Sequence, residues 1–161
     1  MSNLSKLKRK RSGEANLDLH DQLKVSIDLA NKYHHKQVDK SGLPYILHPL
    51  HVMNNVSGIE AKIVAILHDI IEDTPLTIED LMIHGFDLNI VDAIDIITKI
   101  KGEHYDDYLK RVKDNELARI VKIADLSHNM DISRLANPTE KDYTRIEKYR
   151  KASEYLKGKS N

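Results

Sequence analysis

The chain has 161 residues, of which 40% are hydrophobic, and its 25 basic and 25 acidic side chains give a formal net charge of zero. A chain of this length can bury one substantial core, so we expect a single domain. The balanced charge gives no general attraction to nucleic acid or to an anionic membrane. The absence of cysteine excludes disulfides and thiolate metal sites and suits a cytoplasmic protein. Any metal ligand must therefore be His, Asp or Glu.

The first residues are basic, with the run Lys6-Leu-Lys-Arg-Lys-Arg11. No apolar segment follows this run, so it does not predict a secretory signal, and no stretch approaches the length of a membrane span. We interpret residues 1–16 as a solvated, disordered leader rather than a nuclear address or a nucleic-acid arm. The folded domain is expected at residues 17–157, followed by a short tail at 158–161.

Helical periodicity begins near residue 17, where Leu19, Leu23 and Ile27 recur at a spacing of four. The stretch Ser41-Gly-Leu-Pro44 is typical of a loop. Pro49 suits the first turn of a second helix, and we expect His48 to begin that helix in an extended conformation because it precedes proline.

Later helices are marked by their end signals. Thr74-Pro75 stops a central apolar helix, and Thr77 followed by Asp80 is typical of a capping box that begins the next one, which ends near Gly85. Further helical patterns cover 88–99, 104–133 with a break near 114, and 139–157, where Thr139 can act as the cap. No segment is typical of a strand, so the sequence predicts an all-α single domain of seven or eight helices.

The central helix carries a polar stripe in Ala65-Ile-Leu-His-Asp-Ile-Ile-Glu-Asp-Thr74. At about 100° per residue, His68, Asp69, Glu72 and Asp73 share one side of the helix and the apolar residues occupy the other. Ala65 lies one turn earlier on the polar side, where we expect its small side chain to leave room for a ligand. Three carboxylates this close repel one another unless a cation neutralises them, so the stripe favours a cation site over a solvated face.

Two residues elsewhere can complete such a site. His48 lies at the start of a helix, and Asp125 interrupts the apolar run 120–126, where a carboxylate is costly unless it is paired or metal-bound. A set of His and Asp ligands suits Mn²⁺, Fe²⁺ or Zn²⁺. The alternatives are a capping role for His48 and an ion pair of Asp125 with Lys122 or Arg119. Surface positions are expected for His20, His34, His35, His51, His84 and His104.

Four segments together resemble a known family. They are Tyr33-His-His-Lys-Gln-Val-Asp-Lys-Ser-Gly42, Pro44-Tyr-Ile-Leu-His-Pro49, Leu67-His-Asp-Ile-Ile-Glu-Asp-Thr74 and Val121-Lys-Ile-Ala-Asp-Leu-Ser-His-Asn-Met130. In this order they resemble the HD superfamily of metal-dependent phosphohydrolases, and specifically the RelA/SpoT-type hydrolase domain and the small alarmone hydrolases. The resemblance spans about residues 20–156 and implies an HD-domain helical bundle.

The resemblance also implies roles for single residues. It makes His48, His68, Asp69 and Asp125 the metal ligands, with Mn²⁺ as the usual ion. Glu72 and Asp73 match the acidic pair that positions and deprotonates the attacking water, and Lys40, Ser41 and Asn129 match positions that line the nucleotide site. The implied reaction removes pyrophosphate from the 3′ position of a guanosine polyphosphate alarmone such as ppGpp.

Two of the nucleotide-site expectations have local alternatives. Lys122 could meet phosphate charge because it lies one turn before Asp125, but a solvated lysine explains it as well. Asn129 could bond a ribose hydroxyl, or it could make a local hydrogen bond at the helix end.

The sequence departs from the family pattern at three positions where arginine is common. These positions hold Asp39, Leu126 and Asp131. The departures fall where substrate choice is decided, so the metal site is predicted more firmly than the guanosine alarmone.

Three functions therefore compete: an alarmone pyrophosphohydrolase, a hydrolase of the same fold acting on another nucleotide such as a deoxynucleotide or NADPH, and a catalytically silent scaffold. We expect a small-molecule nucleotide as partner, no nucleic acid or membrane, and no separate synthetase domain, because the chain ends soon after its last expected helix. No heptad pattern predicts a coiled coil, so the oligomeric state stays open.

Overall fold

The structure, a computed structural model, describes residues 17–158. The basic leader 1–16 therefore lies outside the described residues, as do residues 159–161 of the tail. The helices of the described part are α2 (Leu19–Tyr33), α3 (Leu47–Asn54), α4 (Ile59–Leu67), the single turn α5 (Ile70–Asp73), α6 (Ile78–Ile83), α7 (Leu88–Ile97), α8 (Tyr105–Lys113), α9 (Glu116–Asn129) and α10 (Glu140–Leu156), with a 3-10 turn η1 at Ile132–Arg134.

The prediction of an all-α fold is confirmed. Residues 17–158 contain no strand, only one isolated bridge between Val38 and Pro44. Among the α-helices in residues 17–158, only α5 is as short as a single turn. Within that range the other α-helices number eight, in agreement with the predicted seven or eight.

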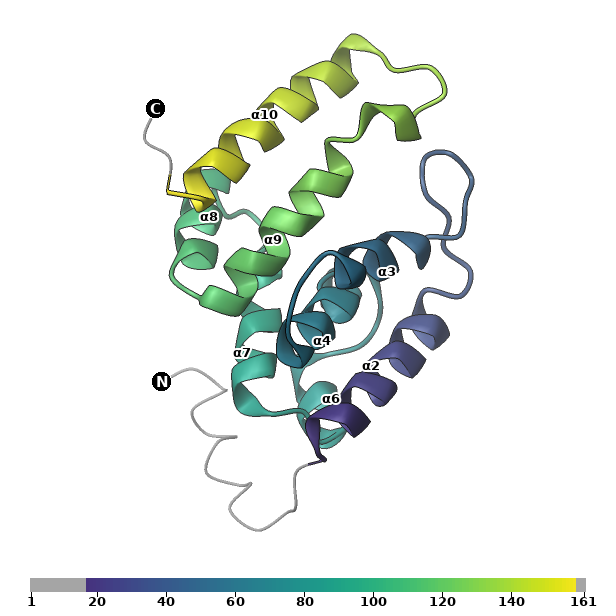
Figure 1. Ribbon diagram of the computed structural model, residues 1–161, viewed down its shortest axis with the longest axis vertical. Helices are drawn as coiled ribbons and strands as arrows, with labels where there is room; N and C mark the ends of the chain where they lie inside the picture. Colours follow the sequence, from purple (N-terminus) through teal and green to yellow (C-terminus); the bar gives the residue numbers. More distant parts are fainter. Residues whose placement is uncertain (1–16, 159–161) are drawn as a thin grey trace.

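Helix α4 is the centre of the bundle. It contacts α2, α3, α7 and α9, and Figure 1 shows it between α2 and α9. The side chains from Ile63 to Leu67 are buried, because this part of the helix is apolar on every side and neighbouring helices pack all around it. Helix α9 packs against α4 on one side and against α10 on the other, so it joins the core to the carboxyl-terminal helix.

The two predicted helix starts are present as capping boxes. The Thr77 Oγ1 accepts from the Asp80 amide at 3.2 Å while the Asp80 carboxylate accepts from the Thr77 amide at 2.9 Å. Thr139 and Asp142 form the same pair at the start of α10. The predicted break near 114 also occurs, between α8 and α9, where Asn115 caps α9. Each is a local signal that the sequence carries within four residues.

The start of α3 differs from the prediction. The helix begins at Leu47, so His48 is helical rather than extended, and Pro49 occupies the third helical position. The first turn tolerates proline because amides there have no partner within the helix. A preceding turn sets the path, since the Leu47 amide donates to the Pro44 carbonyl at 3.1 Å and the His48 amide donates to the Tyr45 carbonyl at 2.9 Å.

The central helix is interrupted. It ends at Leu67 and resumes as the single turn α5 at Ile70, so His68 and Asp69 lie in a turn between two helical segments. The helical wheel that placed the four polar residues on one continuous stripe is therefore wrong across residues 68–69. Ala65 is fully buried rather than leaving an open approach.

None of the helices within residues 17–158 combines the length and the hydrophobicity that crossing a membrane requires.

Candidate metal centre

Three polar side chains from distant parts of the chain meet inside the helical core. His48 from α3, His68 from the end of α4 and Asp125 from α9 are only 5%, 2% and 3% exposed. The His48 Nε2 lies 3.3 Å from the His68 Nε2 and 3.0 Å from the Asp125 Oδ1, and the His68 Nε2 lies 3.5 Å from the same oxygen. One donor atom of each residue thus falls within 4.8 Å of the others.

Asp69 lies at the edge of this cluster. Its Oδ2 is 2.9 Å from the His68 Nε2 and 3.7 Å from the His48 Nε2. The Tyr45 hydroxyl donates a hydrogen bond to the same oxygen. Tyr45 precedes α3, so this bond ties the start of that helix to the turn after α4.

The interrupted helix explains how His68 is oriented. Its Nδ1 lies 2.6 Å from the Ala65 carbonyl oxygen, an acceptor that requires the proton on Nδ1. The Nε2 is then the nitrogen that faces Asp69, Asp125 and His48. Ala65 therefore serves the site through its backbone rather than by leaving space.

The charges of the cluster are strongly coupled. Burial alone raises the pKa of Asp69, but His68 outweighs that effect and lowers the pKa to about 2. Burial likewise opposes ionisation of Asp125, yet Lys122 and the two histidines hold its pKa well below the usual range. The pKa of His68 is raised well above its usual value by both carboxylates despite burial. Without another cation, protons on imidazole therefore neutralise the carboxylates.

A divalent cation fits this donor set. Two imidazole nitrogens and carboxylate oxygens converge on one point, and a cation there would replace the proton that the buried carboxylates otherwise need. His48, His68 and Asp125 would hold the ion from the buried side, and Asp69 would approach from the more exposed side.

Glu72 and Asp73 follow the cluster on α5. Burial and the neighbouring Asp69 raise the pKa of each carboxyl group. The Gln37 side chain donates to the Asp73 carbonyl at 2.9 Å, which fixes the end of this turn against the segment after α2. Both side chains are exposed, so they can reach a solvent molecule beside the cluster.

Lys122 and Asn129 both bond to Asp125. The Lys122 Nζ is 2.8 Å from Oδ2, and the Asn129 Nδ2 donates to Oδ1 at 2.8 Å. The ion-pair alternative for Asp125 is thus present together with the cluster, and the lysine is not freely solvated. In this structure both residues hold a candidate ligand in place.

The loop that contains Lys40 and Ser41 reaches across to η1. The Ser41 hydroxyl donates to the Arg134 carbonyl at 2.6 Å, and the Arg134 guanidinium lies 3.9 Å from the Asp39 carboxylate. Lys40 itself is exposed. Arg134 therefore places a cation beside position 39, where the family pattern has arginine and this chain has Asp.

The other two departures have structural explanations. Leu126 is in the hydrophobic core, with 1% of its surface exposed. Asp131 caps η1, because its Oδ1 accepts from the Ser133 amide at 3.0 Å.

Sequence reasoning missed two residues that contact the candidate ligands, Tyr45 and His128. His128 lies 2.7 Å from His48 between their Nδ1 atoms. Burial and the nearby Arg134 lower the pKa of His128 to about 4, so this imidazole is neutral near pH 7. Its position three residues after Asp125 on the same helix was the available signal.

The surface position predicted for His34 is wrong. This side chain is 2% exposed, its Nδ1 lies 2.7 Å from the Gln37 Oε1, and its ring is 5.0 Å from that of Tyr45. His51 is exposed as expected, although its ring stacks on His128.

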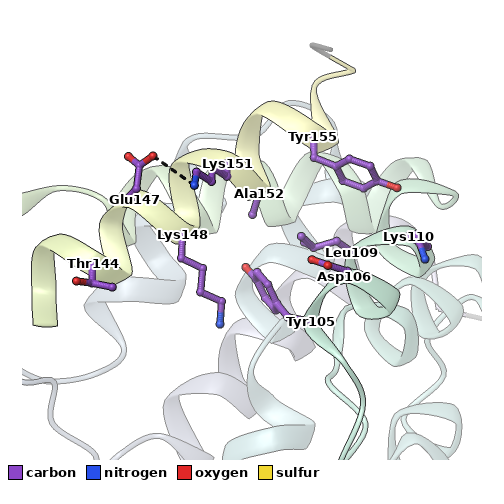
Figure 2. A pocket seen from close by; sticks show the side chains of 10 residues that line it. All are labelled: Tyr105, Asp106, Leu109, Lys110, Thr144, Glu147, Lys148, Lys151, Ala152 and Tyr155. Atoms are coloured by element: carbon purple, nitrogen blue, oxygen red, sulfur yellow. Dashed lines mark ion pairs between the residues drawn. The ribbon is translucent and has the colours of Figure 1, made fainter. Parts of the chain in front are cut away.

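A separate groove of about 880 Å³ lies between α8 and α10. Figure 2 shows Tyr105 near the middle of the groove, with Thr144 toward one end and Tyr155 toward the other. None of the predicted site residues lines this groove.

The sequence is similar to those of known enzymes of alarmone metabolism. No family model matches the chain. It is 33% identical over 124 residues to a guanosine-3′,5′-bis(diphosphate) 3′-pyrophosphohydrolase of Spiroplasma citri, which covers 68% of this chain and 16% of that protein. It is 30% identical over 138 residues to a probable GTP pyrophosphokinase of Mycobacterium leprae, which covers 78% and 17%. The chain thus spans less than a fifth of the length of these curated relatives.

A solved structure has the same fold. The structure of a metazoan SpoT ortholog that hydrolyses ppGpp matches with a TM-score of 0.71 and 18% identity, over 92% of this chain and 90% of that one. The fold is therefore the all-α HD hydrolase fold. The sequence relatives assign it further, and the chain belongs to the hydrolase domains of the RelA/SpoT type.

Proposed function

We propose that this protein is a metal-dependent pyrophosphohydrolase that removes the 3′-pyrophosphate from a guanosine or adenosine polyphosphate alarmone such as ppGpp. The observation that carries the proposal is the convergence of His48, His68 and Asp125, with Asp69 at the edge and an acidic pair beside it. Relatives that carry the name of this activity align with the chain, which supports the substrate class.

The cation in this proposal is Mn²⁺, held by His48, His68, Asp69 and Asp125. When bound, such an ion lowers the pKa of a coordinated water and offsets charge on the phosphoryl oxygens. The carboxylates of Asp69 and Asp125, with their low pKa values, are ionised at neutral pH and so available as ligands.

Glu72 and Asp73 act as the proton acceptors. A general base works best when its pKa approaches the working pH, and burial together with Asp69 raises the pKa of both groups. They lie one turn beyond the ligands on a segment whose end is held by Gln37. The raised pKa values and the exposed position both suit the removal of a proton from the attacking water.

Lys40, Ser41 and Asn129 bind the nucleotide in this proposal, with a smaller contribution from Lys122. Asn129 and Lys122 also hold Asp125, so a substrate contact would come from their remaining donor atoms. Arg134 beside Asp39 restores a cation to the loop side of the site, which favours a polyphosphate substrate. The proposed enzyme is cytoplasmic, and the balanced net charge supports the absence of nucleic-acid and membrane partners.

A second candidate is a hydrolase of the same chemistry that acts on another phosphorylated nucleotide. It is favoured by the aspartate at position 131, which caps η1 and adds no cation near the site. The metal ligands and the acidic pair would be the same in both cases.

The test is pyrophosphate and phosphate release from guanosine and adenosine 3′-pyrophosphates, deoxynucleotides and NADPH, with Mn²⁺ and with chelator. We expect Mn²⁺-dependent pyrophosphate release from an alarmone that disappears in Asp69→Ala. Activity confined to another nucleotide would favour the second candidate function. Absence of activity on every substrate with Mn²⁺ bound would contradict an enzymatic function and favour a catalytically silent scaffold.

A further inference from the structure

Two imidazoles meet edge to edge at the back of the cluster. The Nδ1 atoms of His48 and His128 are 2.7 Å apart, the ring planes are inclined by 10°, and the ring centroids are 5.0 Å apart. His51 contacts His128 differently, with centroids only 3.8 Å apart and planes inclined by 15°. The longer centroid distance and the short N···N distance of the first pair indicate a hydrogen bond in the ring plane, whereas His51 covers the face of His128.

This hydrogen bond has one proton and two possible directions. A neutral imidazole has one protonated and one unprotonated nitrogen, so one of the two Nδ1 atoms must donate and the other accept. The Nε2 of His48 points at Asp125 and His68, where a cation needs an unprotonated nitrogen. The proton of a metal-binding His48 therefore belongs on Nδ1, and His128 must be the acceptor.

The other candidate histidine ligand follows the same rule. His68 gives its Nδ1 proton to the Ala65 carbonyl, a backbone acceptor that cannot donate. For His48 the acceptor is a side chain, which could in principle donate instead. The direction of the hydrogen bond between His48 and His128 therefore depends on which of the two Nδ1 atoms carries the proton.

His128 is held on two sides. The His51 ring lies against its face, and the Arg134 Nη1 donates to its backbone carbonyl at 3.1 Å. The His51 contact keeps the ring in the plane that the hydrogen bond to His48 requires, and the Arg134 contact fixes the backbone that carries the ring, so neither contact uses Nδ1.

We propose that His128 is a positioning residue that accepts the Nδ1 proton of His48 and so directs the unprotonated Nε2 of His48 toward the cation. The role rests on the proposed metal site, and His128 itself touches neither cation nor substrate. With an ion bound, the His48 Nε2 that lies 3.0 Å from Asp125 in its absence must be unprotonated, and the Nδ1 hydrogen bond to His128 then holds the remaining proton.

The first experiment measures Mn²⁺ affinity in three variants, by electron paramagnetic resonance of the free ion. His128→Phe keeps a ring against His51 but removes the acceptor, and we expect Mn²⁺ to bind about 10–100-fold more weakly. His128→Asn places an oxygen acceptor where Nδ1 was, so it should recover most of the affinity. His51→Phe is the matched control, since it keeps a ring face and should bind Mn²⁺ like the unaltered protein.

The second experiment determines where the proton lies, by ¹⁵N NMR of the protein with labelled histidine and with Zn²⁺, a diamagnetic ion, in place of Mn²⁺. We expect a through-hydrogen-bond coupling between the two Nδ1 atoms and a proton attached to His48. A proton attached to His128, or no coupling, would overturn the proposal. Weak Mn²⁺ binding in both His128→Phe and His128→Asn would also overturn it, because that pattern would show that His128 acts through packing rather than as a hydrogen-bond acceptor. A protein that binds neither Mn²⁺ nor Zn²⁺ would contradict the proposed function, whereas the NMR result on the ion-bound protein decides the direction of the hydrogen bond.

Discussion

The candidate metal centre and the groove between α8 and α10 are built in opposite ways. In the centre, His48, His68 and Asp125 come from separate elements, are buried, and contact one another. Along the groove, two exposed lysines pair with neighbours on their own helix, Lys110 with Asp107 and Lys151 with Glu147, while Lys148 lies over the Tyr105 ring. The groove has the volume of a ligand site, but its charges are the kind that water already satisfies.

The difference shows that burial of charged groups marks the candidate site in this fold better than cavity volume does. Burying a carboxylate costs free energy unless partners offset it, so a buried cluster persists only when its partners are held in place. Exposed pairs one turn apart contribute little and need no special arrangement. Volume alone would point to the groove, whereas the cost of burial points to the centre.

The largest expected effect is on the acidic pair beside the centre. Glu72→Gln should lower kcat about 10²–10⁴-fold because it removes a proton acceptor, while Mn²⁺ affinity stays unchanged. Since the pKa of Glu72 is raised, its basic form is lost as pH falls through that raised value, and the acid limb of the rate profile should lie above the pH of an ordinary carboxyl group. A pH–rate profile of alarmone hydrolysis checks both points. An unaltered profile in the variant would show that Glu72 is not the titrating group.

A smaller effect is expected when the buried ion pair is broken. Lys122→Met leaves Asp125 with only its histidine and Asn129 partners, and should lower the free energy of unfolding of the metal-free protein by about 3 kcal/mol. Saturating Mn²⁺ should restore part of this loss, because the ion neutralises the same carboxylate. Denaturant unfolding with and without Mn²⁺ measures the difference. An equal loss in both conditions would show that Lys122 and the ion do not share Asp125.

The smallest effect is expected in the groove. Lys151→Met removes an exposed side chain whose nearest carboxylate oxygen is 4.0 Å away, and should change stability by less than about 0.5 kcal/mol and hydrolysis not at all. Thermal unfolding and the hydrolysis assay test this. A loss of activity comparable to that of Glu72→Gln would show that the groove also takes part in the proposed reaction.

Local features of the fold could be predicted from the sequence. The capping boxes at Thr77 and Thr139 and the break before α9 depend on residues within four positions of one another. The interruption at His68 could not be predicted, because the apolar periodicity continues through it. There the His68 Nδ1 donates a hydrogen bond to the Ala65 carbonyl oxygen, and helix propensities do not predict such a side-chain contact.

The candidate site could be predicted as a set of residues but not as an arrangement. The motif named His48, His68, Asp69 and Asp125, and the structure brings them together, although their roles as ligands stay predictions. Contacts between residues far apart in sequence, such as Tyr45 with Asp69 and His48 with His128, leave no periodic signal. The burial of His34 was missed for the same reason, since it depends on Tyr45 and Gln37 beyond the end of its own helix.

The centre draws its donors from α3, from the turn after α4 and from α9, so an ion bound there would cross-link the early, middle and late parts of the chain. A link of this kind acts only on the folded state, so the apparent stability would increase with the logarithm of the free ion concentration once the site is saturated. The ion that the proposed hydrolysis requires would thus also oppose global unfolding, so its free concentration would affect the proposed activity and the stability together.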